Sequence, residues 1–314
     1  MRLILLKIGD EMSSVKNYLL LTRPNFLLLV PVCVLAGVAA SYFTSGTINV
    51  ASLVLASVGS LLAHMSVNTL NIYFDYKSGI DFNTPKTPFS GGSTILTSGE
   101  VEAKNAFIFG LMMLAAVFGI GIYFIVVYGW AVLPIGLGGI VIIYAYTPYL
   151  TKLPILTELI GPGLGFGLMT LGTAFTQTQT GSYSSIAIVA SVIVGLLVLN
   201  LLLLNEFPDM DADKIGGRKH LPILLGKKNT AVIYCAITVA AYVLLLVSAI
   251  AGILPLLALL GLLTLPVGIK AMIGALKNHS DTPKLIPSLA MNVLTVQLTP
   301  LLMGIGIIIA KAVL

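Results

Sequence analysis

Asn68-Thr-Leu-Asn71-Ile-Tyr-Phe-Asp75-Tyr-Lys-Ser-Gly79-Ile-Asp81 closes one long apolar stretch of this chain, and Asn205-Glu-Phe-Pro-Asp209-Met-Asp-Ala-Asp213 closes another. Carboxylates at the edge of a bilayer are costly to maintain, so acids in these places indicate function. Residues four apart on a helix are neighbours, which pairs Asn71 with Asp75 and Asp209 with Asp213. These two clusters decide how the rest of the sequence is interpreted.

The composition is that of an integral membrane protein. Of the 314 residues, 57% are hydrophobic and only 9% are charged, whereas about 25% of residues in a soluble domain are charged. We therefore expect a single membrane domain over 1–314. The first residues lack a small-residue cleavage site, which favours a retained N-terminus over a signal peptide. Cys33 and Cys235 lie in apolar stretches and predict buried thiols.

Nine stretches are apolar over the roughly 20 residues that a helix needs to cross the hydrocarbon. They are 24–43, 48–71, 104–128, 130–147, 156–177, 184–204, 230–251, 253–273 and 288–312. We therefore predict an all-α, polytopic fold with nine transmembrane helices. Alternate glycines in the run 161–167 predict close contact between helices.

The charges are distributed very unequally between the two ends of these stretches. Among the 17 Lys and Arg, only Lys311 falls at the outer end, and all 12 Asp and Glu fall on the inner side. The positive-inside rule then predicts a cell-membrane protein with a cytosolic N-terminus and a C-terminus outside. The chemistry is expected on the cytosolic face.

The two acidic segments, 72–103 and 205–229, follow the second and sixth stretches and are expected to be cytosolic loops that face one another. Oxygen ligands suit Mg²⁺, which shares its remaining positions with substrate phosphates. We predict two Mg²⁺ ions that clamp a diphosphate; the ligands would be Asn71, Asp75, Asp209 and Asp213. The alternative is a pair of ordinary solvated loops with helix-capping side chains.

Further candidates surround the predicted metal site. Lys152 and Arg218 are predicted to hold a departing diphosphate, and Tyr144 is a third catalytic candidate. The predicted substrate contacts are Arg23, Asn68, Lys77, Asp81, Tyr146, Asn205 and Lys214. His64 and His220 are candidate bases, and for His64 the alternative, a hydrogen-bonded helix residue, is favoured.

The motifs resemble those of the UbiA superfamily of intramembrane prenyltransferases. Its first motif, N-x-x-x-D-x-x-x-[DG], is matched by Asn71, Asp75 and Gly79, and its second, D-x-x-x-D, by Asp209 and Asp213. The strings 71–81, 88–93 and 205–222 are similar to the branch that prenylates 1,4-dihydroxy-2-naphthoate, and Arg23-Pro24 precedes the first span as in the family. Two departures from that branch are Ile72, in place of Asp, and Thr94, in place of Gly or Arg.

The resemblance implies helices bundled around a central cavity and an Mg²⁺-dependent enzyme embedded in the lipid bilayer. It would transfer a polyprenyl group from polyprenyl diphosphate to an aromatic acceptor, 1,4-dihydroxy-2-naphthoate, in menaquinone biosynthesis. An alternative acceptor is geranylgeranylglyceryl phosphate or another phenol. A secondary transporter is the rival class, but its acids would lie near the bilayer midplane. No nucleic-acid partner is expected.

Overall fold

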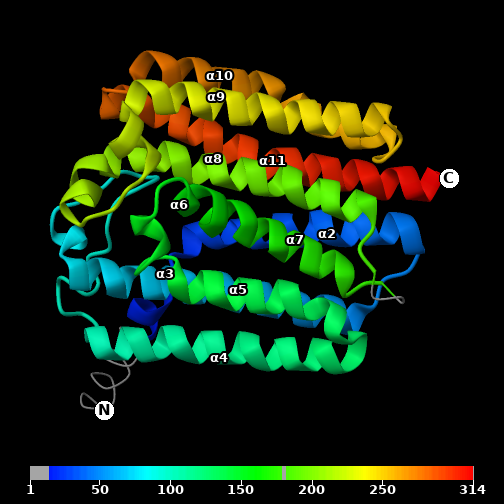
Figure 1. Cartoon of the computed structure of the whole chain (residues 1–314), viewed down its shortest axis with the longest axis horizontal. Coiled ribbons are helices and arrows are strands. Elements are labelled where there is room, and N and C mark those ends of the chain that lie inside the picture. The colour runs from blue at the N-terminus through cyan, green and yellow to red at the C-terminus, as the bar shows by residue number, and fades with distance from the viewer. Residues whose placement is uncertain (1–13, 179–181, 314) are drawn as a thin grey trace, which may run out of the picture.

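The computed structural model describes residues 14–178 and 182–313, which form helices and connections without a strand. The long helices lie side by side along one direction, with α9 and α10 at one edge and α4 at the other (Figure 1). The elements are η1 (Pro24–Leu28), α2 (Leu29–Ser45), α3 (Val50–Ser78), η2 (Ile80–Phe82), α4 (Ala103–Tyr128), η3 (Trp130–Val132), α5 (Leu133–Ala145), η4 (Leu150–Lys152), α6 (Leu156–Glu158), the π-helix η5 (Leu159–Leu164), α7 (Gly165–Phe175), α8 (Ser185–Ile215), α9 (Leu221–Ile250), η6 (Leu256–Thr264), α10 (Leu265–Asn278) and α11 (Thr282–Val313).

Seven helices in the described ranges are long and apolar enough to cross a membrane, so this is a multi-pass membrane protein. They are Pro24–Ser45, Val50–Ser78, Ala103–Tyr128, Ser185–Ile215, Leu221–Ile250, Leu256–Asn278 and Thr282–Val313. The fourth predicted stretch forms a shorter apolar helix, Trp130–Ala145. The fifth is divided into α6, η5 and α7, because the run around Pro162 adopts a π-helix. Nine crossings therefore stay a prediction.

The acidic segments differ from the predicted loops, because both begin as helix. Helix α3 continues through Asp75 to Ser78 and ends where Gly79 adopts a φ of 80°, a conformation that favours glycine. Helix α8 continues past Pro208 and through both acids of its motif to Ile215. The metal-ligand candidates thus project from the ends of long helices, and only the residues beyond them form loops.

Helix α2 packs closely on α7, and α8 on η5, because small residues face one another. A Cβ atom on Gly37 of α2 would collide with the Thr170 carbonyl of α7. A Cβ on Gly195 of α8 would lie 2.6 Å from the Gly163 carbonyl. Small residues let helix backbones approach in a membrane, where dispersion replaces the hydrophobic effect between helices. The predicted close contact at 161–167 is confirmed.

Buried side-chain amides tie α8 to α9 and α11. Asn200 Nδ2 donates to the Tyr234 carbonyl at 2.9 Å and to Thr238 Oγ1 at 2.8 Å. Asn292 Nδ2 donates to the Asn200 carbonyl at 3.0 Å, and the Tyr234 hydroxyl donates to Asn292 Oδ1 at 3.0 Å. Each bond satisfies a polar group that would otherwise be costly in hydrocarbon. The network holds α8 in place, and α8 carries the second acidic motif.

Candidate active site

One cavity of about 410 Å³ runs through the half of the bundle formed by α2, α3, α4, α5, α7 and α8. The charged and amide side chains that line its polar end are Arg23, Asn68, Asn71, Asp75, Asp81, Asn205, Glu206, Asp209, Asp213 and Arg218. Arg23 lies just before η1, and the others come from the ends of α3 and α8 and from the segments that follow those helices. The structure therefore brings the two sequence motifs to one site.

Arg218 joins the two motifs. Its Nη1 donates to Asp213 Oδ1 at 2.7 Å, and its Nη2 donates to Asp75 Oδ1. Asp75 lies at the end of α3 and Asp213 at the end of α8, and both acids are buried. Charge-assisted bonds of this kind are stronger than neutral ones. A single guanidinium thus neutralises one acid from each motif and holds the two helix ends together.

A glycine-containing loop contacts the remaining acids through its backbone. The N–H of Gly91 donates to Asp209 Oδ2 at 3.2 Å, and the N–H of Ser93 donates to Asp81 Oδ1 at 3.2 Å. Gly91 has a φ of 112°, and a Cβ on Gly92 would collide with Asp81 Oδ1. Glycine permits both the conformation and the close approach.

The polar end contains more acid than its own cations neutralise. Asp81 Oδ2, Asn205 Oδ1 and Asp209 Oδ1 are buried and have no hydrogen-bond partner within the described residues. Burial, reinforced by the charge of Asp75, raises the pKa of Asp81 to about 7. Such oxygen atoms are the ligands that Mg²⁺ prefers.

The geometry specifies how an ion would fit. Within residues 14–178 and 182–313, no three His, Cys, Asp or Glu side chains converge to form a complete metal site. Mg²⁺ commonly binds through one or two carboxylates and completes its shell with water and substrate phosphates. The free oxygens of this cavity fit that pattern, with the phosphate supplied by the substrate.

Three further buried side chains lie beside the motifs, namely Glu158, Glu206 and His220. The sequence predicts a candidate base at His220 and no role for Glu158 or Glu206. Nδ1 of His220 lies 3.2 Å from Asp213 Oδ2 and 3.4 Å from Glu206 Oε1. Glu158 accepts the Leu221 N–H at 2.8 Å through Oε1. These contacts connect α6, α8 and the start of α9 behind Asp213. An acid inside an apolar stretch is a functional candidate by default, and that signal identifies Glu158.

The other sequence candidates divide into two groups. Arg23, Asn68 and Tyr146 line the cavity with the acids, and Asn68 is fixed by a 2.9 Å bond from its Nδ2 to the Thr22 carbonyl. Four others are exposed and lie outside the cavity lining, namely Lys77, Tyr144, Lys152 and Lys214. The structure does not bring this second group to the site, and their roles stay predictions.

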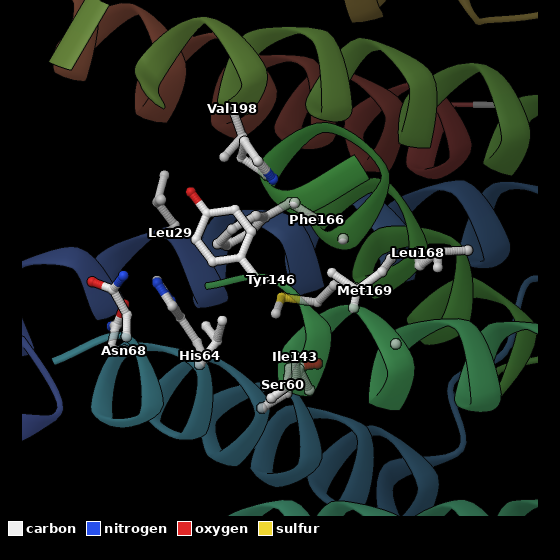
Figure 2. Close-up of a pocket in the computed structure, with 18 of the residues that line it drawn as sticks. Leu29, Ser60, His64, Asn68, Ile143, Tyr146, Phe166, Leu168, Met169 and Val198 are labelled. Carbon is white, nitrogen blue, oxygen red and sulfur yellow. The ribbon is translucent and has the colours of Figure 1, made fainter. Parts of the chain in front are cut away.

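Beyond the acids the cavity becomes apolar. Its lining on α3 extends from Asp75 to Ala56, which at about 1.5 Å per residue is roughly 28 Å. The hydrocarbon of a bilayer is about 30 Å thick. Figure 2 shows part of this lining, where Phe166, Leu168 and Met169 project from α7. The whole cavity, its charged end and its apolar groove together, therefore spans nearly the thickness of the hydrocarbon.

An intramembrane protein with this cavity is suited to a substrate that has an anionic head and a long apolar tail. The chain belongs to the UbiA prenyltransferase family, whose model matches residues 28–294. It is therefore a prenyltransferase, as the resemblance of its motifs predicted.

Individual relatives differ in the acceptor that their names specify. The chain is 32% identical over 229 residues to the 1,4-dihydroxy-2-naphthoate octaprenyltransferase of Bacillus subtilis, covering 71% of this chain and 70% of that protein. It is 25% identical over 226 residues to the digeranylgeranylglyceryl phosphate synthase of Pyrococcus horikoshii, covering 69% and 72%. Its fold is similar to that of a UbiA homolog from Archaeoglobus fulgidus bound to DMAPP and Mg²⁺. The TM-score is 0.57 at 15% identity, and the match covers 93% of this chain and 99% of the other.

Replacing Arg218 by Ala should lower prenyl-transfer turnover by about 10²–10³-fold, the usual cost of removing a donor that stabilises developing negative charge. Lys228→Ala is the matched control, because Lys228 is exposed and outside the cavity lining. It should change turnover by no more than about a few-fold, since an anchoring charge contributes only ~1 kcal/mol. Turnover at saturating donor and Mg²⁺ is measured for both variants and for Lys152→Ala. Equal losses in the Arg218 and Lys228 variants would contradict the assignment. A loss in Lys152→Ala as large as in Arg218→Ala would place Lys152 at the diphosphate in the substrate complex.

Proposed function

We propose that this prenyltransferase transfers a polyprenyl group from polyprenyl diphosphate to 1,4-dihydroxy-2-naphthoate and releases diphosphate. The observation that carries the proposal is the continuous cavity that joins unneutralised acids to an apolar groove. The similarity to the Bacillus subtilis octaprenyltransferase supports this acceptor. The weaker similarity to the glyceryl phosphate synthase keeps a glycerol phosphate lipid as the second candidate.

The acidic end is proposed to bind the diphosphate. Asn71, Asp75, Asp209 and Asp213 would hold two Mg²⁺ ions. The similar fold of a UbiA homolog bound to DMAPP and Mg²⁺ supports a metal-dependent reaction. Mg²⁺ bound there would supply Lewis acidity for departure of the diphosphate. Arg218, once Asp75 and Asp213 bind cations, is free to donate to the leaving group.

The side chains of the cavity walls are proposed to assist the steps that follow diphosphate binding. The C–O bond of the donor breaks with its electron pair on the diphosphate, and the ring of the acceptor forms the new C–C bond. The aromatic faces of Tyr146 and Phe166 line the cavity, and such faces stabilise a cation beside them. The apolar lining of the cavity would keep water away from the allylic cation. For a naphthoate acceptor, loss of CO₂ restores the aromatic ring.

The groove beyond these rings is proposed to hold the prenyl tail. Gly121 of α4 and Gly136 and Gly139 of α5 line it, and a Cβ atom added to any of them would meet no atom within 4 Å. The absence of side chains here keeps the groove wide between α4 and α5. A prenyl tail that enters from the acidic end would therefore meet open space between α4 and α5.

The site is proposed to face the cytosol, as the charge distribution of the sequence indicates. The segments after α3 and α8 lie at the same end of the bundle, because Arg218 contacts Asp75. The C-terminus of α11 lies at the opposite end (Figure 1).

The activity is tested with isotope-labelled octaprenyl diphosphate and a panel of acceptors in detergent. We expect labelled product with 1,4-dihydroxy-2-naphthoate, no reaction in EDTA and recovery with Mg²⁺. Asp75→Ala and Asp209→Ala should each abolish transfer. Asp211→Ala should not, because Asp211 is exposed and outside the cavity lining. Product with geranylgeranylglyceryl phosphate alone would replace the proposed acceptor. Near-normal turnover of Asp75→Ala would remove the metal site.

Gly136→Leu should shorten the donor that the enzyme accepts. The added side chain enters the groove, and overpacking typically costs about 1–3 kcal/mol, or roughly 10–100-fold in rate. We expect that loss with octaprenyl diphosphate and a much smaller one with geranyl diphosphate, both measured as kcat/KM. Gly119→Leu, on the exposed side of α4, should leave the ratio unchanged. A uniform effect of Gly136→Leu on both donors would contradict the tail groove.

Orientation is tested by labelling single cysteines in intact cells and in inverted vesicles. In a background without Cys33 and Cys235, the cysteine of Ser98→Cys should react only with reagent on the cytosolic side. The cysteine of Thr47→Cys should react only from outside, because both native residues are exposed and lie at opposite ends of α3 and its neighbours. The reverse pattern would invert the topology and place the site on the outer face.

A further inference from the structure

A row of polar side chains continues along α3 beyond the acidic end. Ser60, His64 and Asn68 are spaced by four residues, lie on one face of the helix and line the cavity. His64 is seven residues before Asn71, which is roughly 10 Å along the helix axis. The row therefore lies between the proposed diphosphate site and the apolar groove.

His64 is buried without a hydrogen-bond partner. Its side chain is 5% exposed, and its Nδ1 has no partner among the described residues. The favoured sequence-based interpretation, a hydrogen-bonded structural histidine, is not supported. Leaving a buried polar atom unpaired costs free energy, so native structures rarely retain one without a reason.

The imidazole is held in a defined direction. It packs edge-to-face against Phe166, with ring centroids 5.0 Å apart and an interplanar angle of 89°. Figure 2 shows it projecting from α3 into the space bordered by Asn68, Tyr146 and Phe166. Asn68 is fixed by its bond to the Thr22 carbonyl. The result is a compartment with aromatic walls and neutral polar groups along one side.

The side chains of this compartment suit one part of the proposed substrates better than the others. A prenyl tail has no hydrogen-bonding group for His64. A diphosphate is better matched by the acidic end, where Asp75 lies about three turns farther along α3. Among the described residues, Arg23 and Arg218 are the cations that line the cavity, and both belong to its polar end. A flat ring bearing hydroxyl groups satisfies both the aromatic walls and the unpaired nitrogen.

We propose that His64, with Phe166 and Tyr146, forms the binding subsite for a hydroxylated aromatic acceptor, and that the imidazole hydrogen-bonds a ring hydroxyl. The proposal rests on the proposed function, since it assigns a place to the aromatic acceptor of that reaction. The subsite favours a ring over a glycerol phosphate, which has neither a flat face nor a phenolic hydroxyl. His64 then determines acceptor specificity.

The test compares two ligands that differ only in the hydroxyl groups. The dissociation constants of 1,4-dihydroxy-2-naphthoate and of 2-naphthoate are measured by calorimetry on the full chain in detergent, with inorganic diphosphate and Mg²⁺ present. The ratio of the two constants isolates the contribution of the hydroxyls, as in a double-mutant cycle. Wild type should prefer the dihydroxy ligand, and His64→Ala should reduce that preference by about three- to tenfold, the range for one neutral hydrogen bond.

Two further variants control the result. Ser57→Ala should keep the wild-type ratio, because Ser57 lies on α3, bonds the Leu53 carbonyl at 2.7 Å and does not line the cavity. His64→Asn retains a polar group and should recover part of the preference if His64→Ala loses it. Thermal unfolding and gel filtration confirm that each variant is folded.

The outcomes separate this subsite from the proposed function. An unchanged ratio in His64→Ala, or an equal loss of both ligands, would overturn the subsite while leaving prenyl transfer to the naphthoate intact. If wild type binds neither ligand and transfers the prenyl group only to a non-aromatic acceptor, the proposed acceptor fails and the subsite fails with it. A hydroxyl-dependent loss confined to the His64 variants is the expected result.

Discussion

Charge neutralisation of buried carboxylates is the constraint on which this structure depends. The acids at the ends of α3 and α8 lie at the edge of an apolar bundle, where an unpaired charge is costly. Arg218 neutralises one acid from each helix, while loop amides hold one oxygen of each of two others. Among the described residues, Asp81 Oδ2 and Asp209 Oδ1 have no hydrogen-bond partner. The protein is thus assembled around a deficit of positive charge, and the proposed Mg²⁺ ions would supply the missing charge.

Helix α8 connects this charged end to the membrane interior. Its central Asn200 is tied to α9 and α11 by buried hydrogen bonds, and its last turns carry Asp209 and Asp213. Because one continuous helix both packs in the core and carries the acids, the packing of the core also fixes the positions of the acids. Sites on regular elements are held more accurately than sites on loops. The contacts of His220 and Glu206 behind Asp213 add a second layer of support.

The sequence was sufficient for the parts of the site that depend on helical spacing. Asn71, Asp75, Asp209 and Asp213 do line one cavity, because residues four apart share a helix face. The lengths of the acidic helices were misjudged, since an apolar criterion ends a span at its first polar residue, whereas the backbone continues until Gly79 or Gly216.

Positions in short connections could not be predicted in the same way. Lys152 and Tyr144 were chosen for proximity in the sequence, but the direction of a side chain near a short, irregular connection is set by tertiary packing. Both are exposed, whereas Tyr146 from the same segment enters the cavity. The proposed binding role of His64 could not be predicted from the sequence either, because no sequence pattern reveals that a buried nitrogen lacks a partner.

The loop that covers the acids acts through its main chain, and this decides which substitutions it tolerates. Gly91 and Ser93 each donate an N–H to a carboxylate, and the other oxygen of Asp209 and of Asp81 has no partner in the part of the chain that the structure describes. Exchange of the Ser93 side chain preserves its N–H, so an alanine scan would overlook that contribution. Proline at the same position removes the donor itself. Any side chain at Gly92 would displace Asp81. The side chains of this loop can therefore vary only where the substitution preserves the backbone conformation and the amide hydrogens.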